Sequence, residues 1–463
     1  MSSSFRTFII PLLAVQGYLT FVLLLYLFGP WPWPSDNDLK LVLYLIAAQA
    51  LIAIGYLSAW PRSKSYALAT DARIRRASVG RGLKFFEVAF WISLLMIVPT
   101  SFARSGSAIP DVMSGISYTG EVYNANIDRL SEGGVEVYVE YLRYLLGPWL
   151  LGFLPLLVFY WSKIHAWKRA VSVIIVLYFI AIYISIGVNK GIADVIITVP
   201  FLVYMGNKAR TSNIRIPKRV LQIVGIGVFV AFLILFGRGQ EGREGDVGRE
   251  GVFNSGLELV WADSGTFGDI AGPDARIAYE SLARYLTGGY YVLALAFDTE
   301  HKSTYGIGNS MFLARQADAV FGTTYFTEES LPGRIEANLG ISQFGLWHSA
   351  YTWIASDVGF AGALVVVALF ARSMALTWSL AVFTLDFRSV ILFYFFVIMF
   401  FYLPGNNQIF QSGESCLAFL FFAGWLFLAN PFRQSAGAMG RGPALKIKPA
   451  GFGSGDSNRE PPR

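Results

Sequence analysis

Long apolar runs, separated by short polar segments, dominate the chain. A helix needs about 20 mostly apolar residues to cross the roughly 30 Å hydrocarbon layer of a membrane. About ten runs approach or reach that length, although those at 191–206 and 389–404 are short. They cover residues 8–28, 41–60, 85–102, 142–161, 170–188, 191–206, 220–236, 351–371, 389–404 and 416–430. The pattern predicts an all-α integral membrane protein with about ten transmembrane helices.

One long segment, residues 237–350, separates the seventh run from the eighth. Loops of more than about 12–15 residues are usually functional or disordered. The opening Gly237–Gly245 is rich in glycine and charge and is predicted to be mobile, whereas 276–298 has helical spacing around a Gly-Gly pair. We therefore expect one large, partly helical loop. The expected organisation is helices 1–7 in 1–236, the loop in 237–350, helices 8–10 in 351–430, and a disordered tail in 431–463.

Composition and charge agree with a membrane protein and give it an orientation. The chain has 463 residues, of which 54% are hydrophobic and only 15% are charged, whereas about a quarter of an average soluble domain is charged. The sequence pI is about 9.2, but the basic residues gather in the short loops on the side of the N-terminus, as the positive-inside rule expects. Both termini are therefore predicted to be cytoplasmic and the large loop to face away. No nucleic-acid partner is expected.

The residues that usually mark metal or covalent chemistry are scarce. Cys416 is the single cysteine, which excludes an intrachain disulfide and a cysteine-rich metal site. The large loop contains no HExxH, DxD or GxSxG motif. The sequence therefore predicts neither a metal nor a cofactor.

Arginines and aromatic residues are the remaining chemical feature of the large loop. Guanidinium groups bind phosphate oxygens in two-pronged geometry, and aromatic rings stack against sugar faces. The loop arginines include Arg238, Arg243, Arg276, Arg284, Arg315 and Arg334. This combination suits a phosphate-linked glycan at a membrane surface.

Four segments carry a resemblance to a known family. They are Asn189–Asp194 (NKGIAD), Tyr285–Tyr291 (YLTGGYY), Gly306–Ser310 (GIGNS) and Trp347–Gly362 (WHSAYTWIASDVGFAG). In this order, and with this topology, the chain resembles the Wzy-type oligosaccharide repeat-unit (O-antigen) polymerases.

The resemblance implies an enzyme of the bacterial cytoplasmic (inner) membrane. Such a polymerase transfers a growing glycan from undecaprenyl pyrophosphate onto a new lipid-linked repeat unit, outside the membrane, and builds an O-antigen, capsule or exopolysaccharide. The lipid pyrophosphate leaves, and neither metal nor nucleotide is needed. The implied partners are undecaprenyl-pyrophosphate-linked oligosaccharides, membrane lipids, a chain-length regulator and a flippase.

The implied reaction needs a proton acceptor and cations that stabilise the leaving pyrophosphate. His348 is the first candidate for the base, because His165 lies in a basic cytoplasmic loop and His301 looks solvated. The alternative for His348 is an interfacial histidine beside aromatic residues. Asp357 falls inside the predicted eighth span, where an ionisable group is a functional hypothesis by default. It either tunes the site or forms a structural pair with Lys190 or another buried cation.

The candidate binding residues each have a structural alternative. Lys190 lies four residues before Asp194, which allows either a simple ion pair or a lysine that faces the pyrophosphate. Three arginines are candidates for pyrophosphate contacts and two aromatic residues for sugar contacts, although solvated and core roles are the alternatives. These five residues are Arg238, Arg284, Arg334, Tyr290 and Trp347.

Two other functions remain open. An O-antigen ligase-type transferase uses the same donor but passes the glycan to lipid A core. A polytopic glycan-lipid transporter or flippase belongs to a different class, and transporters often show inverted repeats and broken helices. The position of the buried charges separates the classes, because a central cavity through the protein favours transport and a cleft at the outer leaflet favours glycan transfer.

Overall fold

The computed structural model describes most of the chain and leaves several segments undescribed. The described residues are 3–131, 134, 136–214, 219, 227, 236–237, 251–265, 270, 272–343 and 347–428. The predicted seventh span at 220–236, the predicted mobile opening of the large loop and the predicted tail at 431–463 therefore lie largely or wholly outside the described residues.

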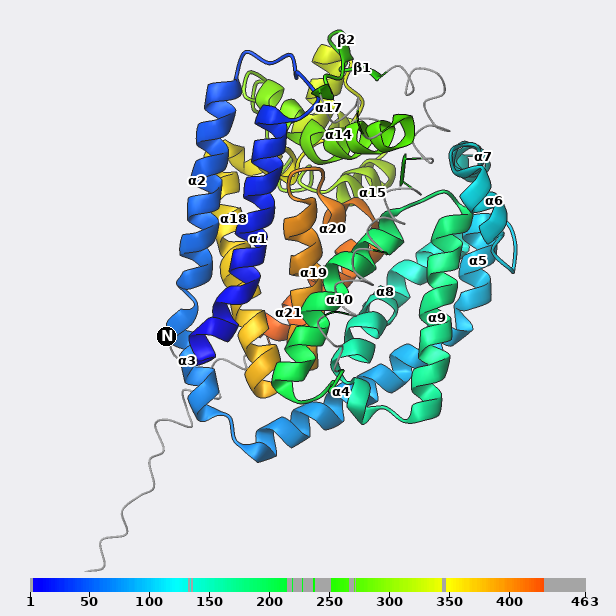
Figure 1. Ribbon diagram of the computed structural model, residues 1–463, viewed down its shortest axis with the longest axis vertical. Helices are drawn as coiled ribbons and strands as arrows, with labels where there is room; N and C mark the ends of the chain where they lie inside the picture. The colour runs from blue at the N-terminus through cyan, green and yellow to red at the C-terminus, as the bar shows by residue number, and fades with distance from the viewer. Residues whose placement is uncertain are drawn as a thin grey trace, which may run out of the picture.

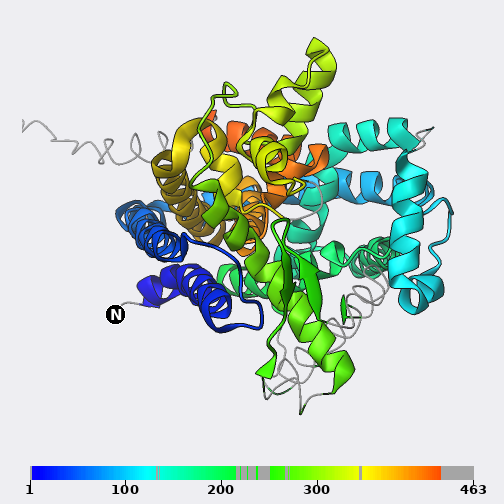
Figure 2. The ribbon, with the colours of Figure 1, turned by 90° about the horizontal axis from the view of Figure 1, so that it is seen from above.

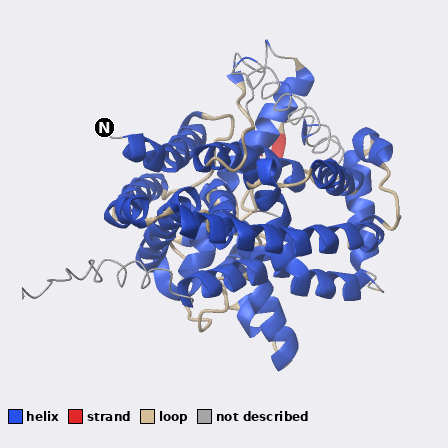
Figure 3. Cartoon of the chain, turned by 90° about the horizontal axis from the view of Figure 1, so that it is seen from below, coloured by secondary structure: helices blue, strands red, loops and turns tan. Residues whose placement is uncertain are grey.

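Helices make up nearly all of the described chain, as Figure 3 shows. The first half contains α1 (Ser3–Phe28), α2 (Asp38–Leu57), α3 (Trp60–Ala69), α4 (Ala72–Leu95), α5 (Ile97–Ser105), α6 (Val112–Ser117), α7 (Thr119–Ser131), α8 (Glu136–Phe159), the 3₁₀ helix η1 (Trp161–Lys163), α9 (Ala166–Ser185) and α10 (Lys190–Ala209). The second half contains α14 (Pro273–Ala296), α15 (Met311–Phe321), α16 (Tyr325–Glu328), α17 (Leu331–Leu339), α18 (Ala350–Thr384), α19 (Phe387–Tyr402), α20 (Gln408–Gln411) and α21 (Gly413–Leu428). A small antiparallel ribbon pairs β1 (Val252–Asn254) with β2 (Leu259–Trp261).

The helices confirm a membrane-embedded, all-α protein. Among the described residues, six helical segments are long and apolar enough to cross a membrane, and a seventh is added if α4 and α5, bent by 47° at their junction, form one span. The apolar helices α19 and α21 are shorter than a full span. Every predicted run within the described residues falls on a helix, but a count of ten spans is not established.

The outer faces of the long helices are apolar, which is the reverse of a soluble protein. Leu13, Leu43, Ile54, Leu177 and Leu369 each expose more than half of their surface. Large exposed apolar areas of this kind mark a surface that meets lipid or another protein. Their positions along α1, α2, α9 and α18 place that surface around the bundle, as a bilayer requires.

The described residues of the large loop from 251 onward, which are 251–265, 270, 272–343 and 347–349, lie over one end of the helical bundle (Figure 1). We call them the cap. Figure 2 looks down on this end and shows α14 lying across the bundle, with α1 and α2 at one side and α6 to α9 at the other. The N-terminus of α1, α3 and the beginning of α4 lie toward the opposite end (Figure 1). The cap and the N-terminus are thus on opposite ends of the bundle, as the charge pattern predicted, although the side that faces the cytoplasm remains a prediction.

The α1–α2 connection fastens the cap to the bundle. The indole N–H of Trp31 donates to the carbonyl of Glu280 at 2.7 Å, and that of Trp33 donates to the hydroxyl of Thr287 at 3.1 Å. The Trp33 ring also stacks on Tyr291, with 5.0 Å between centroids. Because both tryptophans are buried, these contacts fix α14 against the end of the bundle.

A break divides α18 near its cap end. Gly359 has φ +68° and ψ 172° inside the helix, a conformation that side chains other than glycine rarely adopt. The short stretch before it, Ala350–Val358, is mostly buried under the cap. The helix as a whole is long and apolar enough to cross a membrane. Hydropathy alone predicted one continuous span at 351–371, because the break leaves the apolar run intact.

The segment between α19 and α21 turns back below the cap instead of emerging as a solvent loop. Its carbonyl at Leu403 accepts from the amide of Ala350 at 3.0 Å, and that of Phe410 accepts from the Ser310 hydroxyl at 2.7 Å. The side-chain amide of Asn407 donates to the carbonyl of Asn309 at 2.7 Å. Irregular backbone at such depth is tolerated where it is buried in protein or lines a cavity, and this segment does both.

Candidate functional site

A cavity of about 140 Å³ lies among seven helices near the cap end of the bundle. Side chains from α5, α8, α9, α10, α19, α20 and the beginning of α21 contribute to its wall. Lys190 is the first residue of α10 and Glu414 is the second of α21. Both helices run away from the cap (Figure 1), so the polar part of the cavity lies at their cap-side ends.

The wall of this cavity has a polar part and an apolar part. The polar groups are Arg104, Arg143, Tyr183, Lys190, Asp194, Tyr394, Gln408, Glu414 and Ser415. The apolar groups include Leu150, Leu151, Phe153, Leu154, Val176, Phe179, Ile180, Val195, Phe395 and Ile398. Three cations and two carboxylates therefore face one small, largely apolar space.

The two arginines of the wall belong to a network that joins three helices. Glu414 Oε2 lies 2.5 Å from Arg143 Nη2 and 3.6 Å from Arg104 Nη2. Behind the wall, Glu140 bridges the same pair, 3.1 Å from Arg104 Nε and 3.6 Å from Arg143 Nε. Arg143 also donates from Nη1 to the Thr100 hydroxyl at 2.8 Å. Because all four charges are largely buried, each one needs its partners to remain ionised.

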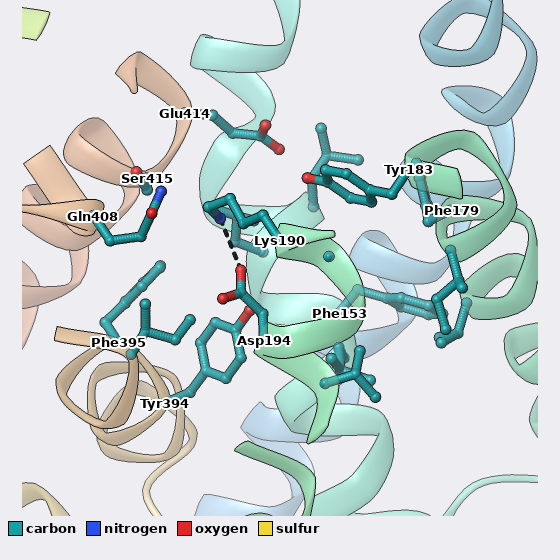
Figure 4. Close-up of a pocket in the computed structure, with 18 of the residues that line it drawn as sticks. Phe153, Phe179, Tyr183, Lys190, Asp194, Tyr394, Phe395, Gln408, Glu414 and Ser415 are labelled. Carbon is teal, nitrogen blue, oxygen red and sulfur yellow. Dashed lines mark hydrogen bonds and ion pairs between the residues drawn. The ribbon is translucent and has the colours of Figure 1, made fainter. Parts of the chain in front are cut away.

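The third cation, Lys190, is paired differently. Its ammonium lies 2.7 Å from Asp194 Oδ2, one turn further along α10. The lysine side chain is 35% exposed and that of Asp194 is 11% exposed, so the ammonium is the more accessible of the two. Figure 4 shows the pair projecting into the space between α10 and α19, with the Tyr394 hydroxyl pointing toward Asp194.

The NKG sequence at the α9–α10 reversal explains how this pair reaches the cavity. A Cβ at Gly191 would lie 2.1 Å from the ring of Tyr183, so only glycine lets α9 and α10 approach this closely. Tyr183 in turn accepts a hydrogen bond from Arg104 at 3.2 Å. The close approach therefore connects Lys190 to the arginine network through one aromatic side chain.

His348 does not line the cavity. Its side chain is buried with 1% exposed, and neither ring nitrogen has a hydrogen-bond partner in the described part of the chain. Burial lowers the pKa of His348 to about 4, against a weaker opposing effect of the backbone at Ser342 and Ile341. The predicted base is therefore a neutral, enclosed imidazole in this structure. Its neighbour Trp347 packs on Tyr402 at 6.3 Å, at the end of α19.

Asp357 holds a segment of the cap. One carboxylate oxygen accepts from the amide of Thr304 at 2.5 Å, and both oxygens lie 2.9 Å from the Thr304 hydroxyl. Asp357 lies before the break at Gly359, at the cap end of α18 and not in mid-span. The alternative pairing with Lys190 is not formed, because Lys190 is bound to Asp194.

The other predicted binding residues lie in the cap or at its base, apart from the cavity wall. Arg284 packs over the rings of Phe253 and Trp31 at 4.6 and 5.9 Å, and burial lowers its pKa to about 10. Arg334 lies 3.7 Å from Glu300. Tyr290 is buried and Trp347 is half-buried, so both are packing residues here, while Arg238 lies outside the described residues.

Sequence reasoning found Lys190 and missed the arginines beside it. Arg143 stands inside the predicted run 142–161 and Arg104 just beyond 85–102. An ionisable residue in or near a span is a functional hypothesis by default, and that signal was available for both. Glu414 lies just before the tenth run, 416–430, and nothing in that local sequence identifies its partners.

Comparisons with protein-family models, with curated proteins and with solved structures find no match to this chain. The fold and the cavity define a class: a polytopic helical membrane protein with a charged, partly apolar cavity beneath an extramembrane cap. Within the described residues, no group of three or more His, Cys, Asp or Glu side chains is placed to hold a metal ion.

Proposed function

We propose that this protein is a membrane glycan transferase of the repeat-unit polymerase type, acting on undecaprenyl-pyrophosphate-linked oligosaccharides in the bacterial cytoplasmic membrane. The observation that carries the proposal is the cavity, which combines Arg104, Arg143 and Lys190 with a wall of aliphatic and phenyl side chains. A polyprenyl pyrophosphate has the same two parts, an anionic head and an apolar chain.

The polar end of the cavity suits the head group. Guanidinium forks bind phosphate oxygens in pairs, and a lysine ammonium adds a mobile point charge. The carboxylates of Glu414 and Asp194 are paired with two of these cations, Arg143 and Lys190. A pyrophosphate would compete for the same donors, most readily for the half-exposed Lys190.

The apolar wall suits the lipid chain. It is built from α8, α9, α10 and α19, three of which are among the helices long enough to cross a membrane. About 140 Å³ has room for a head group but not for an oligosaccharide as well. The glycan would therefore extend toward the cap, and the chain would leave between helices toward lipid.

The position of the cavity favours transfer over transport. Its charged groups lie near the cap ends of α10 and α21. A transporter is expected to bind its substrate near the bilayer midplane between repeats. The ligase-type reaction uses the same donor and differs in its acceptor, so the cavity supports it equally, and the polymerase is preferred on the resemblance of the four sequence segments.

The implied chemistry is a single displacement. A hydroxyl of the acceptor glycan attacks the anomeric carbon of the donor, and the bond between that carbon and the pyrophosphate oxygen breaks. Negative charge then develops on the leaving pyrophosphate. Fixed cations at that point stabilise the transition state more than the ground state, which is the role we assign to Arg104, Arg143 and Lys190. A flippase would supply the lipid-linked units and a chain-length regulator would limit the product.

The test is a complementation experiment in a host strain whose own gene is disrupted. The strain receives the wild-type chain, Arg143→Gln or the control Arg388→Gln, and surface glycan length is compared on a gel beside a protein-level blot. Arg388 is a suitable control because its pair with Asp386, at 2.6 Å, lies at the other end of α19. We expect single-repeat glycan with Arg143→Gln and a full ladder with Arg388→Gln.

Two results would count against the polymerase. An unchanged ladder in the disrupted strain would remove the proposal. Long glycan that accumulates on the lipid carrier without reaching lipid A core would identify the ligase-type reaction instead.

A further inference from the structure

One carboxylate oxygen of the cavity wall is buried without a hydrogen-bond donor among the described residues. Asp194 Oδ2 is bound to Lys190, but Oδ1 makes no hydrogen bond within the part of the chain that the structure describes. The residue is only 8% exposed and belongs to the cavity wall. A buried acceptor without a donor is unfavourable, so such a group calls for an explanation.

The other carboxylates near the cavity are engaged. Glu414 Oε2 lies within 3.6 Å of two guanidinium groups, which hold its charge and satisfy that oxygen. Glu140 is shared between the same two arginines and lies behind the wall. His348, the base suggested by sequence, is enclosed away from the cavity. Asp194 is therefore the acidic residue best placed to accept a proton there.

On the basis of the proposed function, we propose that Asp194 is the catalytic base, with Oδ1 accepting the proton of the acceptor-sugar hydroxyl. As that hydroxyl oxygen bonds to the anomeric carbon, its O–H bond breaks and the proton passes to Oδ1. The electron pair of the broken carbon–oxygen bond leaves with the pyrophosphate. The protonated Asp194 then returns its proton to water.

The surroundings of Asp194 suit this role. Lys190 holds the carboxylate from the Oδ2 side and fixes its orientation. The phenol groups of Tyr394 and Tyr402 face it from α19, and Tyr183 and Glu414 are the next titratable groups around the lysine. Gln408 projects into the same space (Figure 4). Its amide offers both a donor and an acceptor to a sugar hydroxyl.

One arrangement of charges thus serves both halves of the reaction. Lys190 lies between the carboxylate that would take the proton and the space that would hold the pyrophosphate. The arginines face the same space from α5 and α8. Proton acceptance and leaving-group stabilisation then take place within one small cavity.

The test uses the full-length protein reconstituted in liposomes with lipid-linked repeat units extracted from the host. Asp194→Asn keeps the size and one acceptor oxygen of the side chain but cannot take a proton. We expect the rate of polymer formation to fall by about 10²–10⁴-fold, the usual contribution of a general base. We also expect Asp194→Glu to recover part of the rate. Asp386→Asn, at the opposite end of α19, is the matched control and should polymerise normally.

A second readout separates catalysis from structure. Undecaprenyl pyrophosphate alone should raise the unfolding temperature of Asp194→Asn as it does for the wild type, because the cations remain.

The possible failures are distinct. Near-normal polymerisation by Asp194→Asn would overturn the assignment of the base while leaving the proposed function intact. Loss of rate together with loss of the shift caused by undecaprenyl pyrophosphate would also overturn it, because Asp194 would then act by holding Lys190. A wild-type protein that makes no polymer and shows no such shift would refute the proposed function itself.

Discussion

The cavity and the core of the cap both bury ionisable side chains, but they accommodate them in different ways. In the cavity, Arg104, Arg143 and Glu414 are paired across helices and face an open space. In the cap, His348 is enclosed without a hydrogen-bond partner among the described residues, and Arg284 packs over aromatic rings. Pairing in the cavity stabilises the charged forms of these side chains, whereas enclosure in the cap opposes them.

The pKa values outside the membrane follow this difference. Burial lowers the pKa of His348 to about 4 and that of Arg284 to about 10, because a charged group loses its hydration. Chemistry that needs fixed positive charge therefore belongs to the cavity. Residue type alone favours the cap as the place of the functional site, because the cap contains aromatic residues, many of the arginines and a histidine.

The largest expected effect comes from breaking the cavity network at Glu414. Glu414→Gln leaves Arg104 and Arg143 with Glu140 as their remaining carboxylate, and removing one member of a buried ion pair usually costs about 3–5 kcal/mol. We expect a clear fall in the unfolding temperature of the detergent-solubilised protein, measured by tryptophan fluorescence.

The matched control for that prediction is Asp386→Asn. Asp386 binds Arg388 two residues further on, and Arg388 also faces the Trp425 ring at 5.5 Å. The remaining arginine can turn toward that ring and toward solvent, so the cost should be about 1–2 kcal/mol. Equal losses in the two variants would contradict the idea that the cavity network is the more tightly coupled.

The second prediction concerns acid stability and the enclosed imidazole of His348. The pKa is about 6.5 in an unfolded chain and about 4 in the folded protein. Between these values the unfolded chain binds a proton that the folded protein does not, so stability falls as the pH falls. This pKa difference corresponds to a loss of about 3 kcal/mol in the free energy of unfolding once the pH has fallen through both pKa values.

His348→Gln removes this titration. Its unfolding temperature should therefore decline less than that of the wild type between pH 7 and pH 4.5. The comparison is made at several pH values in the same detergent, so that the carboxylates common to both proteins cancel. Parallel curves for the two proteins would mean that His348 is accessible to protons in the fold.

The sequence was sufficient for the helices and insufficient for the site. Each apolar run that the structure describes falls on a helix. Such runs are predictable because crossing a hydrocarbon layer imposes length and composition on each segment separately. Ion pairs between helices cannot be predicted in this way. Arg143 and Glu414 are 271 residues apart, and nothing local to either one identifies the other.

Lys190 was found because its partner is local. The spacing to Asp194 is four residues, and the helix that joins them follows from an apolar run. The surroundings of Asp357 were not predicted for the opposite reason, since they depend on the break at Gly359 and on Thr304, 53 residues away. A single glycine in an apolar run does not change hydropathy, and its φ of +68° is visible only in the fold.

The smallest expected effect tests whether Asp357 is an anchor for the cap. Asp357→Asn should weaken the contacts to the amide and hydroxyl of Thr304 and destabilise the protein by about 1–2 kcal/mol. Thr304→Val removes only the hydroxyl and should cost less. If the two residues act through each other, the double variant should lose less stability than the sum of the two single variants.

Hydrogen exchange in Asp357→Asn should increase over residues 303–310 and stay unchanged around Lys190. Faster exchange around Lys190 instead would mean that Asp357 supports the cavity, and the contrast between cap and cavity would no longer hold.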